Sequence, residues 1–112
     1  MTTEADIRAA LERARLDTEP DPPIAISAEY DARLDLVLLH LDNGRRLVIP
    51  RENLQGLESA TEAQRSQIEI FGGYDIAWPQ LDLDHYLPEL LEGIYGSEAW
   101  MHSLEHRRSV AA

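Results

Sequence analysis

The sequence predicts a small α+β domain in which a small antiparallel sheet, built on a β-hairpin, packs with short helices and a C-terminal helical pair. Three observations support this fold class. Asn43-Gly44 separates two apolar runs, and this dipeptide favours the tight turn of a hairpin. Gly72-Gly73 separates two further strand-like runs and permits backbone angles that side chains disfavour. Leucines at helical spacing follow Pro88, a residue suited to the first position of a helix.

The composition favours a single cytoplasmic domain. Its 112 residues include no cysteine, so disulfide scaffolds and thiolate metal sites are excluded. No apolar run reaches the roughly 20 residues that span a bilayer, and the acidic N-terminus does not resemble a signal peptide. We therefore expect no membrane association and no cofactor.

The N-terminal part predicts a helix followed by a linker. Thr3 begins a stretch with capping-box spacing, and apolar residues then recur at helical spacing, at Ile7, Ala10, Leu11 and Ala14. Prolines end this helix. We therefore predict an amphipathic helix over 1–19, a proline-rich linker over 20–23, a single α+β domain over 24–105 and a frayed tail over 106–112.

The hairpin strands are expected at 33–41 and 45–49, after an edge strand at 24–30 and a turn at Asp31-Ala32. A two-residue loop at Asn43-Gly44 would pair Asp42 with Arg45, His40 with Leu47, and Leu38 with Ile49. The buried face would then carry Leu34, Leu36, Leu38, His40, Leu47 and Ile49. The opposite face would carry Arg33, Asp35, Val37, Leu39, Leu41, Arg46 and Val48. His40 is interpreted as a structural residue.

The second half predicts short elements separated by clear boundaries. Pro50 ends the hairpin, and a helical turn should place Leu54 and Leu57 inward. A second capping-box spacing begins at Thr61. Two strands, an acidic loop and two helices should follow, at 68–71, 76–78, 79–84, 88–93 and 97–108, with Gly93 or Gly96 closing the first helix and Ser97 capping the second.

Several landmarks occur together and in order: Asp42-Asn43-Gly44, Val48-Ile49-Pro50, the segments 54–61 and 72–78, and Leu87-Pro88-Glu89-Leu90-Leu91-Glu92-Gly93-Ile94-Tyr95-Gly96. In these the chain resembles the bacterial domain-of-unknown-function family 2442 over residues 22–102. The resemblance implies a small α+β domain with an antiparallel sheet and no established catalytic residue. It also implies an arrangement similar to toxin–antitoxin pairs, since family members are often encoded beside another small protein.

The distribution of charge indicates the type of partner. The chain carries 21 acids and 10 bases, and no Lys or Arg occurs from Ser66 to His106. Such a field attracts a basic partner, and Tyr and Trp are common at interfaces. We therefore predict a non-enzymatic protein-interaction module, antitoxin-like or adaptor, that binds a basic protein through Tyr74, Asp75, Trp78, Asp82, Asp84, Tyr86, Glu89 and Tyr95.

Other functions are considered beside this one. A DNA-binding transcriptional regulator would use Arg33, Arg45, Arg46 and Arg51, although nucleic-acid binding is disfavoured by a net charge of −11. An acidic mimic of nucleic acid that inhibits a nucleic-acid-binding machine is a further alternative. A homodimer is expected to form through the first helix or the strand edge at 24–30.

No catalytic motif or metal site is predicted. The chain has no Gly-x-Ser-x-Gly elbow and no lysine after a glycine-rich loop. Asp82, Asp84 and His85 have side chains that bind divalent metals, but we interpret them as a solvated acidic loop.

Overall fold

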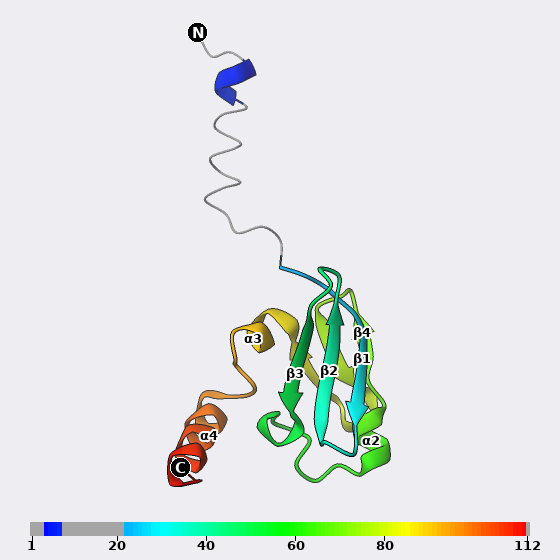
Figure 1. Cartoon of the computed structure of the whole chain (residues 1–112), viewed down its shortest axis with the longest axis vertical. Helices are drawn as coiled ribbons and strands as arrows, with labels where there is room; N and C mark the ends of the chain where they lie inside the picture. The colour runs from blue at the N-terminus through cyan, green and yellow to red at the C-terminus, as the bar shows by residue number, and fades with distance from the viewer. Residues whose placement is uncertain (1–3, 8–21, 112) are drawn as a thin grey trace.

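The computed structural model describes residues 4–7 and 22–111, with side chains to Arg107 (Figure 1). Residues 4–7 are helical, and the rest of the predicted first helix lies outside the described residues. The elements from residue 22 onward are β1 (Ala25–Asp31), β2 (Leu36–Leu41), β3 (Arg46–Pro50), the 3-10 turn η1 (Arg51–Asn53), α2 (Glu62–Ser66), β4 (Glu69–Phe71), β5 (Asp75–Trp78), the 3-10 turn η2 (Pro79–Leu81), β6 (Leu83–Tyr86), α3 (Leu87–Leu91) and α4 (Glu98–Ala111).

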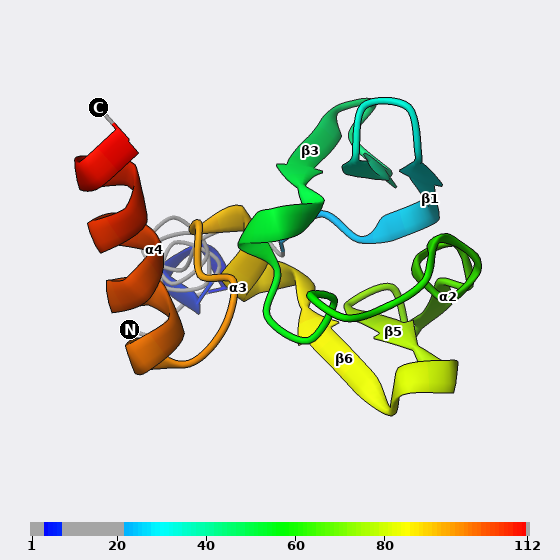
Figure 2. The same ribbon diagram turned by 90° about the horizontal axis from the view of Figure 1, so that it is seen from below.

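The strands form two antiparallel sheets of three strands each, which confirms the predicted fold class. Sheet A has the order β1-β2-β3 and sheet B the order β4-β5-β6. Figure 2 shows sheet A above sheet B, with α3 and α4 to one side. The core lies between the sheets, because buried side chains come from both inner faces and from the 54–57 loop and α3: Val37, Leu39, Leu41, Ile49, Leu54, Leu57, Ile76, Trp78, Leu87 and Leu90.

The hairpin β2–β3 forms as predicted, but its register differs by one residue. Leu39 lies opposite Leu47 and Val37 opposite Ile49. Gly44 donates to the Leu41 carbonyl and has a φ of 83°, so the loop has three residues rather than two. Since successive side chains of a strand point to opposite faces, the one-residue shift reverses the predicted orientation of β2.

The buried face of β2 therefore carries Val37, Leu39 and Leu41, which were predicted to point outward. Leu36, Leu38 and His40 lie on the outer face and are only half-buried. On β3 the prediction was correct for Ile49, which is fully buried. Both faces of β2 are apolar, so the hydrophobic pattern alone could not select the register.

Sheet B contains one strand more than the sequence predicted. The segment expected as an acidic loop instead forms η2 and then β6, which pairs with β5. Asp82 adopts left-handed backbone angles (φ 50°) and turns the chain from η2 into β6. The double glycine has φ values of 63° and 81°, as a type I′ turn requires, and it joins β4 to β5 as predicted.

Three of the predicted helix caps, at Thr61, Gly93 and Ser97, are present in the described part of the chain, whereas the cap predicted at Thr3 lies outside it. Thr61 and Gln64 form a reciprocal capping box at the start of α2. Ile94 N–H donates to the Glu89 carbonyl and Gly93 N–H to the Leu90 carbonyl, which is the Schellman motif that ends α3. Ser97 Oγ accepts from Trp100 N–H at the start of α4. The helix α4 continues to Ala111, where the sequence predicted a frayed tail from residue 106.

Candidate protein-interaction site

The outer face of sheet B gathers carboxylates and two exposed aromatic rings. Cross-strand pairs place Glu69 beside Ala77 and Ala77 beside Asp84. In the next row Phe71 lies beside Asp75, and Asp75 beside Tyr86. We call this surface the acidic face: Glu69, Phe71, Asp75, Ala77, Asp82, Asp84 and Tyr86.

The acidic face is shallowly hollowed. Most of its residues line a depression of about 330 Å³, in which Ala77 is buried and the carboxylates of Glu69, Asp75, Asp82 and Asp84 are exposed. Phe71 is 54% exposed and Tyr86 is 49% exposed. No basic side chain lines this depression in the described part of the chain. The surface therefore offers negative charge and aromatic rings together, which suits Arg or Lys side chains.

Strand alternation explains how the local sequence builds this face. In β4 and β5 the apolar Ile70 and Ile76 point towards the core, so their neighbours point outward. Glu69 and Phe71 were missing from the predicted site. A signal was present, because pairing across the Gly72-Gly73 turn places Phe71 opposite Asp75.

The eight residues predicted to bind a partner do not form one surface. Asp75, Asp82, Asp84 and Tyr86 lie on the acidic face. Trp78 does not, and its assignment to the partner site was wrong. Its side chain has no exposed surface, packs in the core and donates from Nε1 to the Arg65 carbonyl at 3.0 Å.

The other three predicted residues lie beside the acidic face or away from it. Tyr74 is half-buried, with its ring centroid 6.3 Å from that of Tyr86, and its hydroxyl donates to the Pro22 carbonyl. Glu89 is exposed on the first turn of α3. Tyr95 lines a separate cleft beside α4.

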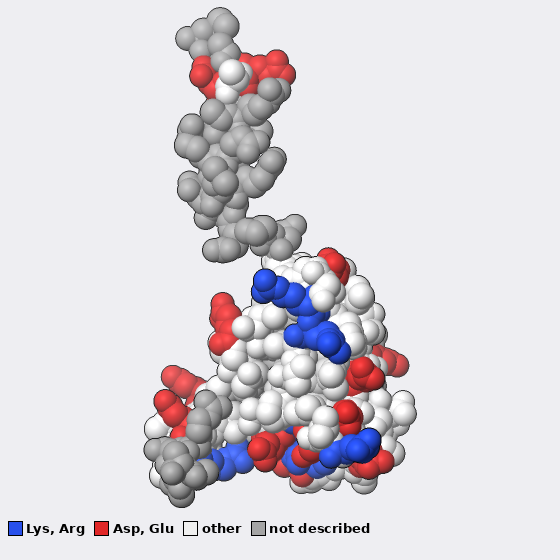
Figure 3. All heavy atoms as spheres, in the orientation of Figure 1, with Lys and Arg blue, Asp and Glu red and all other residues white. Residues whose placement is uncertain are grey.

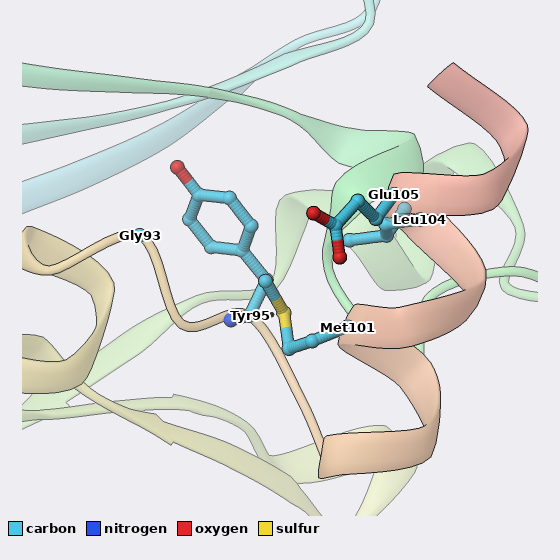
Figure 4. A pocket seen from close by; sticks show the side chains of 5 residues that line it. All are labelled: Gly93, Tyr95, Met101, Leu104 and Glu105. Carbon is cyan, nitrogen blue, oxygen red and sulfur yellow. Dashed lines mark hydrogen bonds between the residues drawn. The ribbon is translucent and has the colours of Figure 1, made fainter. Parts of the chain in front are cut away.

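That cleft has a volume of about 360 Å³ and lies between the α3–α4 connection and α4 (Figure 4). Gly93, Tyr95, Met101, Leu104 and Glu105 line it, and Met101 Sδ accepts from Tyr95 N–H at 3.2 Å. Its lining brings few convergent polar groups, so the cleft offers less to a charged ligand than the acidic face does.

The side chains of Asp82, Asp84 and His85, which are of types that bind metals, do not point towards a common centre. Asp84 points outward on β6, whereas the next residue, His85, points inward. The Nε2 atom of His85 lies 2.9 Å from the Gln55 carbonyl oxygen, and its ring packs edge-on to the ring of Trp78. Among residues 4–7 and 22–107, no group of three or more His, Asp or Glu side chains is arranged to hold a metal ion.

The four arginines of the DNA-binding alternative divide between the two ends of sheet A. Arg45 and Arg46 follow the β2–β3 turn, whereas Arg33 and Arg51 lie at the β1–β2 turn. The six residues of β2 separate these ends by roughly 20 Å at about 3.4 Å per residue.

Arg51 is already engaged in a structural contact. Its guanidinium donates twice to Asp35, at 3.0 and 2.7 Å, and Tyr30 also donates to this carboxylate. The hydrogen bond from Arg51, followed by that from Tyr30, lowers the pKa of Asp35 to about 2. Arg51 thus fixes the β1–β2 turn, where Asp35 has a positive φ of 57°.

Comparison with known proteins identifies the family. The model of the family described as Protein of unknown function (DUF2442) matches residues 25–96. The chain belongs to the DUF2442 family. The resemblance inferred from the sequence is thereby confirmed.

Two solved structures have folds similar to that of this chain. A protein of unknown function from Rhodospirillum rubrum, a crystal structure at 2.75 Å resolution, is 41% identical, with a TM-score of 0.69 over 72% of this chain and 99% of that chain. An uncharacterized protein from Chromobacterium violaceum, solved by NMR in solution, is 27% identical, with a TM-score of 0.64 over 89% of each chain. No curated protein matches the chain.

Within the described residues, no helix has the length and apolar character needed to cross a membrane.

Proposed function

We propose that this protein is a non-enzymatic, cytoplasmic interaction module, antitoxin-like or adaptor, that binds a basic protein partner on the acidic face. The observation that carries the proposal is the hollow lined by four carboxylates and the exposed ring of Phe71, with the exposed ring of Tyr86 beside Asp75 on the same face. Among the described residues, no basic side chain lines this hollow. Arginine suits such a surface because its guanidinium pairs with carboxylates and stacks on aromatic rings.

The position of the acidic face favours a protein over a small ligand. The hollow is shallow and open, whereas small-molecule sites are usually concave and enclose most of their ligand. Figure 2 shows sheet B at one margin of the domain, so an extended or bulky partner can approach its outer face.

The test is affinity purification from the native host at low and high salt, with partners identified by mass spectrometry. The expected result is a basic partner that is lost at high salt, because exposed charge pairs are screened. The variant Asp75→Asn with Asp84→Asn should weaken binding about tenfold at low salt, since each exposed pair contributes roughly 0.2–1 kcal/mol.

A matched control removes two charges elsewhere. Glu52→Gln with Glu62→Gln changes exposed residues of η1 and α2, outside the acidic face, and should leave binding unchanged. Equal loss in both variants, or a partner whose binding ignores salt, would overturn the proposal.

The nucleic-acid-mimic alternative predicts the same dependence on charge. It differs in one outcome, because DNA would then compete with the protein for the captured partner. A partner that binds both at once supports an adaptor.

A further inference from the structure

The outer face of sheet A differs in character from the acidic face. Cross-strand pairs align Glu29, Leu38 and Val48 in one row and place His40 between Ser27 and Arg46 in the next. We call this surface the apolar face: Glu29, Asp31, Leu36, Leu38, His40, Arg46 and Val48.

The middle of the apolar face is open to solvent. Val48 is 48% exposed, Leu36 and Leu38 are half-buried, and Leu34 at the adjoining turn is 66% exposed. Figure 3 views this side of the molecule and shows an uncharged middle, with blue at the end of the hairpin turn. No described element lies over it in Figures 1 and 2. An exposed apolar surface rimmed by polar residues marks an interaction site.

Charge is distributed unevenly across this face. The β1 side carries the carboxylates of Glu29 and Asp31, the central strand is apolar apart from His40, and the β3 side carries the guanidinium of Arg46. His40 Nε2 lies 3.0 Å from Glu29 Oε1, so the imidazole of the central strand contacts the carboxylate on the β1 side. One edge is thus acidic, the centre is apolar and the other edge is basic.

We propose that the apolar face binds the same face of a second copy of this chain, about a two-fold axis parallel to the strands. This axis places β2 over β2 and the β1 edge of one copy over the β3 edge of the other. Glu29 then lies over Val48 of the other copy, and Arg46 lies two residues further along the same β3 strand, roughly 7 Å away and within reach of an arginine side chain. The contact occurs twice by symmetry.

The alternative symmetric arrangements match the charges less well. An axis in the sheet plane but across the strands places β1 over β1, so Glu29 and Asp31 would meet their own copies. The acidic face cannot pair with itself, because four carboxylates would face four others. The dimer inferred from sheet A leaves the acidic face free, so it does not depend on the proposed function.

The size of the face sets the expected affinity. Three strands about 4.8 Å apart, with five or six residues at roughly 3.4 Å each, give a footprint of roughly 300 Å² per copy, or about 600 Å² in total, which is smaller than the roughly 1,200 Å² buried by a stable specific interface. We therefore expect a dimer that forms at micromolar to submillimolar concentration rather than an obligate one.

The test is sedimentation velocity on the full chain at protein concentrations from about 10 to 500 µM, the range in which a weak dimer dissociates. Val48→Glu places charge in the centre and should give a monomer throughout. Phe71→Glu is the matched control, because Phe71 is similarly exposed (54%) but lies on sheet B. It should leave the dimer intact.

Charge reversal tests the axis itself. Arg46→Glu alone and Glu29→Arg alone should each weaken the dimer by about tenfold, since two exposed pairs become repulsive. The variant that combines Arg46→Glu with Glu29→Arg should regain most of the lost dimer affinity, because the two charges are exchanged and attract again. A wild-type chain that stays monomeric at about 500 µM, a dimer that resists Val48→Glu, or one lost in Phe71→Glu would each overturn the inference. The last result would instead indicate a contact between sheet A of one copy and sheet B of another.

Discussion

The outer faces of the two sheets have similar construction and different chemistry. Each belongs to a three-stranded antiparallel sheet whose inner face supplies the core. On sheet A the outward residues of the middle strand are Leu36, Leu38 and His40, whereas on sheet B those of the middle strand are Asp75 and Ala77. One face is apolar between oppositely charged edges, and the other carries a carboxylate on each of its three strands, with two exposed aromatic rings among them.

This difference shows how one small domain can offer two kinds of contact. A surface with an acidic edge and a basic edge complements a copy of itself, whereas a surface with one sign of charge repels its copy and attracts a basic partner. The inner faces do not differ in this way, because both must be apolar to form the core. Substitutions on the inner faces should therefore affect folding strongly, and substitutions on the outer faces should affect mainly binding.

Trp78→Ala should give the largest loss of stability. The side chain is fully buried on the inner face of sheet B, so removing it leaves a cavity and an unpaired Arg65 carbonyl. We expect the free energy of unfolding to fall by about 3–5 kcal/mol, measured by denaturant titration. Tyr86→Ala, on the outer face of the same sheet, should cost roughly 1 kcal/mol or less. Similar losses in both variants would contradict the assignment of inner and outer faces.

Asp35→Asn should give an intermediate loss. The substitution removes the charged partner of Arg51 at the turn beside the apolar face, and we expect about 1–2 kcal/mol, because the half-exposed carboxylate is screened by solvent.

The stability difference between wild type and Asp35→Asn should become smaller at low pH. The folded-state pKa, about 2, lies below the ordinary value of 3.8 for an aspartate, so the ionised carboxylate stabilises the folded state above pH 4. This stabilisation is lost as the pH falls from about 4 to 2. The difference between wild type and Asp35→Asn, measured by urea titration at each pH, should therefore shrink over this window. A difference that is constant from pH 5 to 2 would show that the charge of Asp35 is not its cause.

Val48→Thr and Phe71→Thr should give the smallest effects on folding. Both side chains are about half exposed on outer faces, so the free energy of unfolding, measured at low micromolar protein, should change by about 0.5 kcal/mol or less. A loss above roughly 2 kcal/mol in either variant would mean that its face contributes to the core of the monomer.

Much of the acidic face was predictable, and some of it was not. Asp75, Asp82, Asp84 and Tyr86 were predicted because they lie in the segment without Lys or Arg, and the charges of that segment can be read before its fold is known. Trp78 was included wrongly, since an aromatic residue common at interfaces is equally suited to a core. The charge pattern could not distinguish a core residue from an interface residue, because the face of sheet B that is buried depends on where sheet A packs against it.

The local sequence is enough to specify four boundaries: the capping box at Thr61, the Schellman end at Gly93, the cap at Ser97 and the turn at Gly72-Gly73. Each depends on backbone angles and hydrogen bonds within a few residues, so the chain specifies it without distant contacts. The register of β2, the pairing of β6 and the separation of His85 from Asp84 depend instead on contacts between distant segments of the chain. In each case a strand had two usable faces, and packing between the sheets selected which of them was buried.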